Sequence, residues 1–319
     1  RKAIEFYEQA LAIAKEIGYR RGEGGVLGNL GQTYSDLGEP RKAIEFYEQA
    51  LAIAREFKDR EIKDKKREGI WLGNLGIVHS DLSEPRQAIG FYQQALAIAK
   101  QIGDRRSEGN ALGNLGLEYY HLGEKRKAIE FDEQALAIAK EIGDKKNEGT
   151  WLGNLGIVHS DLGEPRQAIG FYQQALAIAK EIGDRRSEGN ALGNLGLEYY
   201  HLGEKRKAIE FDEQALAIAK EIGDKKNEGT WLGNLGIVHS DLGEPRQAID
   251  YYEQALAIAR EIGDRRGEGN ALFNTSLALD GLGKQAEAAK LAADALAIYK
   301  QIESPVAEQV RRKLEQWQG

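Results

Sequence analysis

"ALGNLGLEYYHLGEKRKAIEFDEQALAIAKEIG", residues 111–143, holds the pattern that decides the fold. Leu112, Leu115, Tyr119 and Leu122 recur at helical spacing, and the following glycine is a residue that commonly ends a helix. The second half of the stretch also ends at a glycine, and its apolar residues recur at the same spacing: Ala128, Ile129, Phe131, Ala135, Leu136, Ile138 and Ile142. The sequence therefore predicts two amphipathic helices joined by a short turn.

This two-helix unit recurs along the chain. Equivalent positions spaced by 40 residues are Gly73, Gly113, Gly153, Gly193, Gly233 and Phe273. Gly28 precedes this series by 45 residues, and we expect the five extra residues, within Lys58–Glu68, to lengthen one connection between repeats. Residues 71–150 and 151–230 differ at only two positions, which indicates tandem duplication of an 80-residue block. Because neither helix of a unit buries its apolar face alone, the units should stack into an α-solenoid.

The two ends of the chain differ. We expect residues 1–303 to form the solenoid, as a half repeat over 1–22 followed by seven helix pairs, and residues 304–319 to form a capping helix. Arg1 begins directly on a second helix, so Ile4 and Leu11 should lack cover. We therefore expect further repeats or another domain upstream, and self-association through this uncovered end.

Composition excludes several classes of function. The formal net charge is -7, whereas nucleic-acid binding needs a surplus of Lys and Arg on one surface. There is no cysteine, which removes disulfides, thiolate zinc sites and cysteine nucleophiles. No apolar run approaches the roughly 20 residues of a membrane span, so we expect a cytoplasmic protein with no membrane partner. No nucleophile–base pair or carboxylate constellation interrupts the repeats, and we predict no enzyme activity, cofactor or metal.

The repeat resembles the tetratricopeptide repeat, whose pattern is met by Leu115-Gly116, Tyr119, Ala128 and Ala135. Its 40-residue length is similar to the long repeats of Pins-type adaptors, kinesin light chains and bacterial NB-ARC signalling ATPases. Two kinds of position depart from the pattern. Asp132 and Asp212 stand where the aromatic kept by Tyr7, Tyr47, Tyr92, Tyr172 and Tyr252 is usual, and His79, His159 and His239 replace the usual first-helix tyrosine. We interpret the histidines as packing residues. The resemblance implies a right-handed superhelix whose first helices line its concave side.

The repeated glycines do not form a phosphate loop, since neither a strand nor a following Gly-Lys accompanies them. Inside a helix each costs about 1 kcal/mol relative to alanine, and close helix contact is the expected compensation. By resemblance, Gly116 is where the second helix crosses, while Gly109 and Gly113 leave room beside neighbouring first helices.

Angles of about 100° per residue place an asparagine ladder opposite the core stripe of the first helices. The ladder comprises Asn29, Asn74, Asn114, Asn154, Asn194, Asn234 and Asn274. An apolar row flanks it: Ile77, Leu117, Ile157, Leu197, Ile237 and Leu277. An exposed apolar row usually marks a binding surface, and a carboxamide matches both groups of an extended peptide backbone. The alternative is that each asparagine bonds to its neighbouring helix and stiffens the solenoid.

A second ladder of alternating charge ends the same stripe: Asp81, His121, Asp161, His201 and Asp241. Solvated pairs, selection of a charged ligand and a metal site are its alternatives, and a metal is disfavoured because successive helices separate the side chains. Basic pairs such as Arg105-Arg106, Lys145-Lys146 and Arg185-Arg186 fit a solvated rim better than an anion site.

These features favour a non-catalytic scaffold that binds a protein through an extended peptide segment in its concave groove. The alternative is the C-terminal sensor of an NB-ARC-type signalling ATPase, which an upstream GxxxxGK[ST] motif would favour.

Overall fold

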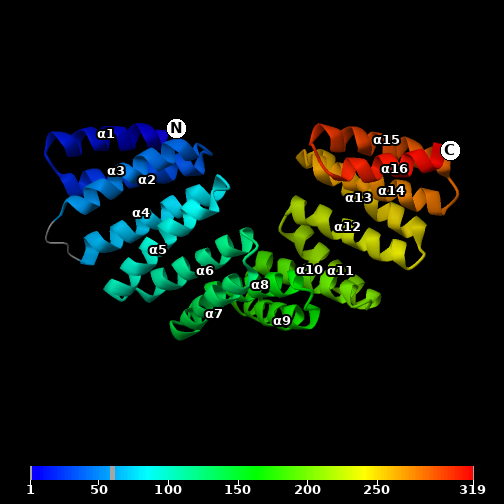
Figure 1. The fold of residues 1–319 in the computed structure, drawn as a ribbon, viewed down its shortest axis with the longest axis horizontal. Helices are drawn as coiled ribbons and strands as arrows, with labels where there is room; N and C mark the ends of the chain where they lie inside the picture. Colours follow the sequence, from blue (N-terminus) through cyan, green and yellow to red (C-terminus); the bar gives the residue numbers. More distant parts are fainter. Residues whose placement is uncertain (1, 58–61, 319) are drawn as a thin grey trace. The chain divides into compact units, whose positions relative to one another are not determined.

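The computed structural model describes residues 2–57 and 62–318. These residues form sixteen α-helices and no β-strand (Figure 1). The first helices of the seven pairs are α2 (Arg20–Asp36), α4 (Ile62–Asp81), α6 (Arg105–His121), α8 (Lys145–Asp161), α10 (Arg185–His201), α12 (Lys225–Asp241) and α14 (Arg265–Gly281). The second helices are α3 (Pro40–Glu56), α5 (Pro85–Ile102), α7 (Lys125–Glu141), α9 (Pro165–Ile182), α11 (Lys205–Glu221), α13 (Pro245–Ile262) and α15 (Gln285–Gln301). Helix α1 (Lys2–Glu16) precedes the pairs, and α16 (Val306–Gln318) follows them.

The chain divides into two compact units, residues 1–158 and residues 159–319. Consecutive helices pack on one another from α1 to α7 and from α9 to α16. First helices of consecutive repeats also touch, as α4 touches α6 and α12 touches α14. This consecutive pairing confirms the predicted all-α solenoid.

Glycines end several helices in the left-handed conformation. Gly103 has φ 70°, and its N–H donates to the Lys100 carbonyl at 3.3 Å while the next N–H reaches Ala99 O at 3.0 Å. This bonding satisfies carbonyls that the helix end would leave unpaired. Ser83 takes the same conformation, with φ 60°, where the duplicated block has Gly163. Only glycine adopts this region without cost, so Ser83 holds a strained turn.

The insertion before α4 does more than lengthen a connection. Helix α4 has 20 residues where α6 has 17, so part of the extra sequence extends a helix. The remainder includes residues 58–61, which lie outside the described part.

The N-terminal end differs from the expected arrangement in two details. Leu11 is not uncovered, because it packs against Leu27 and Ile53, and Ile4 is half-buried. The exposed large apolar side chains at this end are Phe6 and Ile13 of α1 and Ile17, which follows the helix. The first pair begins at Arg20, inside the expected half repeat. At the other end, α16 buries Val310 and Leu314 in a cluster that includes residues of α14 and α15. It therefore covers the last repeat.

Candidate functional site

The predicted apolar row lies on an exposed surface of the first helices, which we call the first-helix face within each unit. Ile77, Leu117, Ile157, Leu197 and Leu277 are between 38% and 45% exposed, and Ile237 is half-buried. Asn29 is exposed, and the other six ladder asparagines are half-buried. The asparagine ladder and the apolar row thus both reach the surface. The first-helix face therefore remains the candidate binding surface.

The first-helix face is hollowed at two places. A cavity of about 200 Å³ lies between α4 and α6, over α5, and its lining includes Asn74, Ile77 and Asn114. The equivalent cavity between α12 and α14, over α13, measures about 710 Å³ and includes Asn234, Ile237 and Asn274. In the smaller one, Lys66 on α4 pairs with Asp104 at 2.8 Å and joins two sides of the cavity region. Apolar floors with a few amides at the rim are typical of ligand sites.

The cavities arise from one residue on the following first helix. A Cβ built on Gly113 would stand 2.3 Å from the indole of Trp151, so the tryptophan fills the gap between α6 and α8. Trp71 fills the gap beside Gly28 in the same way. Ala111 stands at the tryptophan position on α6, and a Cβ on Gly73 would meet nothing within 4 Å. Alanine in place of tryptophan therefore leaves the cavity open.

Of the three expectations for the glycines, the one for Gly109 needs correction. The expectation for Gly116 is confirmed, because a Cβ there would stand 2.5 Å from Asp132 of the crossing second helix. Gly113 makes room for the neighbouring first helix, but its equivalent Gly73 does not, for the reason above. Gly109 lies against Ile138 of its own second helix, not against a neighbouring first helix.

Three ladder asparagines bond within the solenoid. Asn74 hydrogen-bonds the Tyr47 hydroxyl, Asn154 the Asp132 carboxyl and Asn234 the Asp212 carboxyl. These contacts give the stiffening alternative a physical basis at α4, α8 and α12. The asparagine ladder is therefore of two kinds, a distinction that its uniform sequence does not reveal.

Asp132 and Asp212 stand out in the sequence only as departures from the repeat pattern, which carries no signal of a function for them. Each is only 1% exposed. Burial raises the pKa of Asp132 to about 7 and that of Asp212 to about 8, and the bond from asparagine offsets only part of this rise. Two weakly acidic carboxyls thus lie beneath the first-helix face.

Three members of the Asp–His ladder contact residues outside the ladder. His121 Nδ1 lies 3.8 Å from Glu118, and His201 Nδ1 lies 3.7 Å from Glu198, each on its own helix. Asp241 accepts a hydrogen bond from the Tyr200 hydroxyl at 2.7 Å. In residues 2–57 and 62–318, no group of three or more His, Asp or Glu side chains is placed to hold a metal ion.

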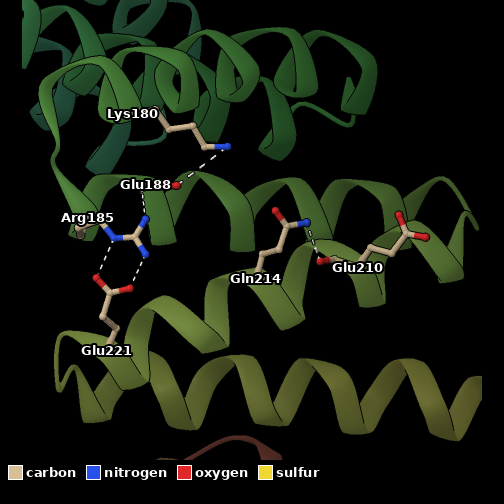
Figure 2. A network of polar contacts seen from close by, with 6 residues as sticks. All are labelled: Lys180, Arg185, Glu188, Glu210, Gln214 and Glu221. Atoms are coloured by element: carbon tan, nitrogen blue, oxygen red, sulfur yellow. Dashed lines mark hydrogen bonds and ion pairs between the residues drawn. The ribbon is translucent and has the colours of Figure 1, made fainter.

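The basic pairs lie beside acidic residues, as a solvated rim requires. Arg185 lies between Glu188 and Glu221 (Figure 2). Its Nε is 3.0 Å from the Glu221 carboxylate, and Lys180 Nζ is 4.0 Å from Glu188. Arg106 likewise pairs with Asp144 at 3.3 Å.

The interpretation of the three first-helix histidines as packing residues is confirmed. His79, His159 and His239 stack on aromatic rings of the following second helix at 5.1 to 5.3 Å, and each Nδ1 lies 2.6 Å from a glutamate.

The family model described as "Tetratricopeptide repeat" matches residues 1–56, 67–141, 126–181, 147–221 and 222–301. No curated protein matches the chain. None of the helices in the described part of the chain combines the length and apolar character that crossing a membrane requires.

Solved structures share the fold at low identity. A signal transduction ATPase with numerous domains and a tetratricopeptide repeat sensor, from Pyrococcus horikoshii, is 17% identical with a TM-score of 0.77, over 97% of this chain and 46% of that one. A Rap protein complexed with competence and sporulation factor is 15% identical with a TM-score of 0.58, over 96% and 98% of the chains. A putative kinesin light chain from Podospora anserina is 20% identical with a TM-score of 0.52, over 62% and 95%.

Proposed function

We propose that the first-helix face of this chain binds an extended peptide segment of a partner protein. The premise is that the chain belongs to the tetratricopeptide repeat family, a family of interaction scaffolds. The observation that carries this proposal is the pair of amide-rimmed cavities between α4 and α6 and between α12 and α14. Peptide side chains would enter the cavities, while Asn114 and Asn274 would bond the backbone. The Rap protein of the same fold, solved with a bound factor, supports this proposal. No step of it requires catalysis.

The test fills both cavities with the residue that the chain itself uses elsewhere. Peptides are selected from a random displayed library on the full chain, and the double variant Ala111→Trp, Ala271→Trp is then titrated with the selected peptide. Tryptophan beside tyrosine is already accommodated where Trp71 stacks on Tyr47 at 6.1 Å, so the variant should fold. We expect binding to weaken by about a hundredfold, equivalent to about 2.7 kcal/mol.

The matched control places tryptophan at the exposed second-helix positions Ala137 and Ala217. Affinity should then be unchanged. Equal binding by both double variants would place the ligand elsewhere and remove the proposal.

The second candidate function is a sensor within a signalling ATPase. The likeness to the Pyrococcus horikoshii protein over 97% of this chain favours it. If the native gene encodes an upstream GxxxxGK[ST] segment, the selected peptide should change the rate of nucleotide hydrolysis by the longer protein; an unaffected rate would argue against a sensor.

A further inference from the structure

Asp132 and Asp212 lie at a position that tyrosine fills in other repeats. A Cβ on Gly236 would stand 2.4 Å from the ring of Tyr252, which shows how closely the tyrosine occupies this place. At the equivalent Gly196, the nearest atom is Oδ1 of Asp212, at 2.5 Å. The aspartate thus reaches the same glycine with a much smaller side chain.

The Asp212 carboxyl is incompletely bonded. Its Oδ1 is buried and has no hydrogen-bond partner among the described residues, and the same holds for Oδ1 of Asp132. Leaving a buried acceptor unpaired costs about 1–3 kcal/mol, more for a charged group. The unpaired carboxyl oxygen, present in both units, can therefore accept a hydrogen bond from a ligand.

The volume that the tyrosine ring would occupy is partly open. A cavity of about 40 Å³ is lined by Leu197, Tyr200, Asp212, Asn234, Ile237 and Val238. Leu197 is 39% exposed on the first-helix face, so the cavity lies directly beneath that surface. One water needs roughly 10–15 Å³, and an ammonium group is of similar size.

Three of the lining side chains, those of Tyr200, Asp212 and Asn234, carry an oxygen that can accept a hydrogen bond. Asp241 lies beside the cavity through its bond from the Tyr200 hydroxyl. Lys205 is the nearby cation, and its Nζ donates to the Asp241 backbone oxygen at 2.6 Å, not to the carboxylate. The surroundings therefore favour a positive group.

We propose that Asp212, and Asp132 at the equivalent place in the other unit, form the floor of a pocket that receives the ammonium of a lysine side chain. This inference rests on the proposed peptide-binding function for the source of the lysine. The ammonium has three donors, which the Asp212 carboxyl, the Asn234 amide oxygen and the Tyr200 hydroxyl would accept. The methylene stem would lie against Leu197 and Ile237. The other five lining residues have identical counterparts in the repeat of Asp132, namely Leu117, Tyr120, Asn154, Ile157 and Val158.

The test uses n-butylammonium as a probe of the pocket alone, on the full chain. Methyl NMR signals of Leu197 and Ile237 report binding, and 1-pentanol serves as the uncharged control of similar length. We expect saturable shifts with the amine and an affinity for the alcohol that is at least about tenfold lower. The reason is that a charge-assisted hydrogen bond is about twice as strong as a neutral one. The double variant Asp132→Tyr, Asp212→Tyr should abolish the shifts, and Asp132→Asn, Asp212→Asn should weaken them while preserving the pocket.

Equal shifts with alcohol and amine, or shifts that persist in both double variants, would overturn the proposal. The absence of any saturable shift would also overturn it and would leave water as the occupant. A library selection then identifies the source of the amine. Lysine enriched at one peptide position on the wild type, but not on the tyrosine variant, supports the proposal. If the amine binds while the library yields no peptide, the pocket stands but peptide binding and lysine as its ligand are both rejected.

Discussion

The contacts between α10 and α12 and those between α12 and α14 use the same glycine framework but leave space at opposite places. Between α10 and α12, Trp231 fills the gap beside Gly193, while Asp212 stands at the tyrosine position. We call this a Trp–Asp interface. Between α12 and α14 the pair is Ala271 and Tyr252, an Ala–Tyr interface, and the gap beside Gly233 stays open.

The difference shows that each of these two interfaces fills one of two places and leaves the other hollow. In the other unit, α6 and α8 form a Trp–Asp interface through Trp151 and Asp132, and α4 and α6 form an Ala–Tyr interface. The contact between α2 and α4 has both Trp71 and Tyr47, so both places can be filled at once. The hollows are thus not forced by the backbone.

The largest expected effect comes from leaving both places of one interface unfilled. Tyr252→Asp would add a Trp–Asp type cavity to an interface that is already open. By analogy with other large-to-small core changes, the free energy of unfolding should fall by about 4 kcal/mol, measured by urea denaturation. Asp212→Tyr is the matched reverse, and it should gain about 2 kcal/mol by removing the unpaired carboxyl oxygen. If both variants lose stability, the two places are not interchangeable and the comparison fails.

A smaller effect should follow pH at the Trp–Asp interfaces. The folded pKa values, about 7 and about 8, lie above the unfolded value, so the folded state binds more protons between pH 4 and 8. Stability contributed by these groups is complete below pH 4 and falls as the pH rises through 7 to 8. Between pH 5 and pH 8 the loss should be about 3 kcal/mol for each of the two carboxyls. Thermal melts of the wild type and of the double variant Asp132→Asn, Asp212→Asn at several pH values measure this loss. Equal slopes of stability against pH in the two proteins would contradict the prediction.

The two interface types should also respond oppositely to a methyl group. Gly113→Ala would push against Trp151 and should lose about 1–2 kcal/mol, as overpacked cores do. Gly73→Ala meets open space and should gain about 1 kcal/mol of helix propensity. Chemical denaturation of both variants checks the sign, and a shared sign would show that Trp151 yields without cost.

The smallest effect separates the two duplicated blocks. Ser83→Gly relieves a left-handed turn that Gly163 occupies without strain, and should gain about 0.5 kcal/mol. The reverse change, Gly163→Ser, should lose a similar amount in the same melting experiment. A Ser83→Gly variant that is less stable would mean that the serine side chain makes a contact worth more than the strain.

Periodicity alone predicted the helix pairs, because a 3.6-residue apolar pattern and terminal glycines are local signals. The exposed ladders were predictable for the same reason. The cavities were not, since each depends on whether a residue 38 positions later, as Ala111 is to Gly73, is alanine or tryptophan. Asp132 was visible as a departure from the family pattern, but its burial depends on α6 and α8 packing around it. Leu11 was misjudged because one side of α1 packs against the next repeat even when the other side is open.

The alternation of tryptophan and alanine constrains how such a gene can change length by recombination. Loss of residues 105–144 would place Trp151 after Gly73 and Tyr92, giving a contact filled at both places, as between α2 and α4. Loss of residues 145–184 would place Ala191 after Gly113 and Asp132, leaving both places hollow. Only gain or loss of two repeats together preserves the order of open and closed contacts, and the inherited 80-residue block is a unit of that length.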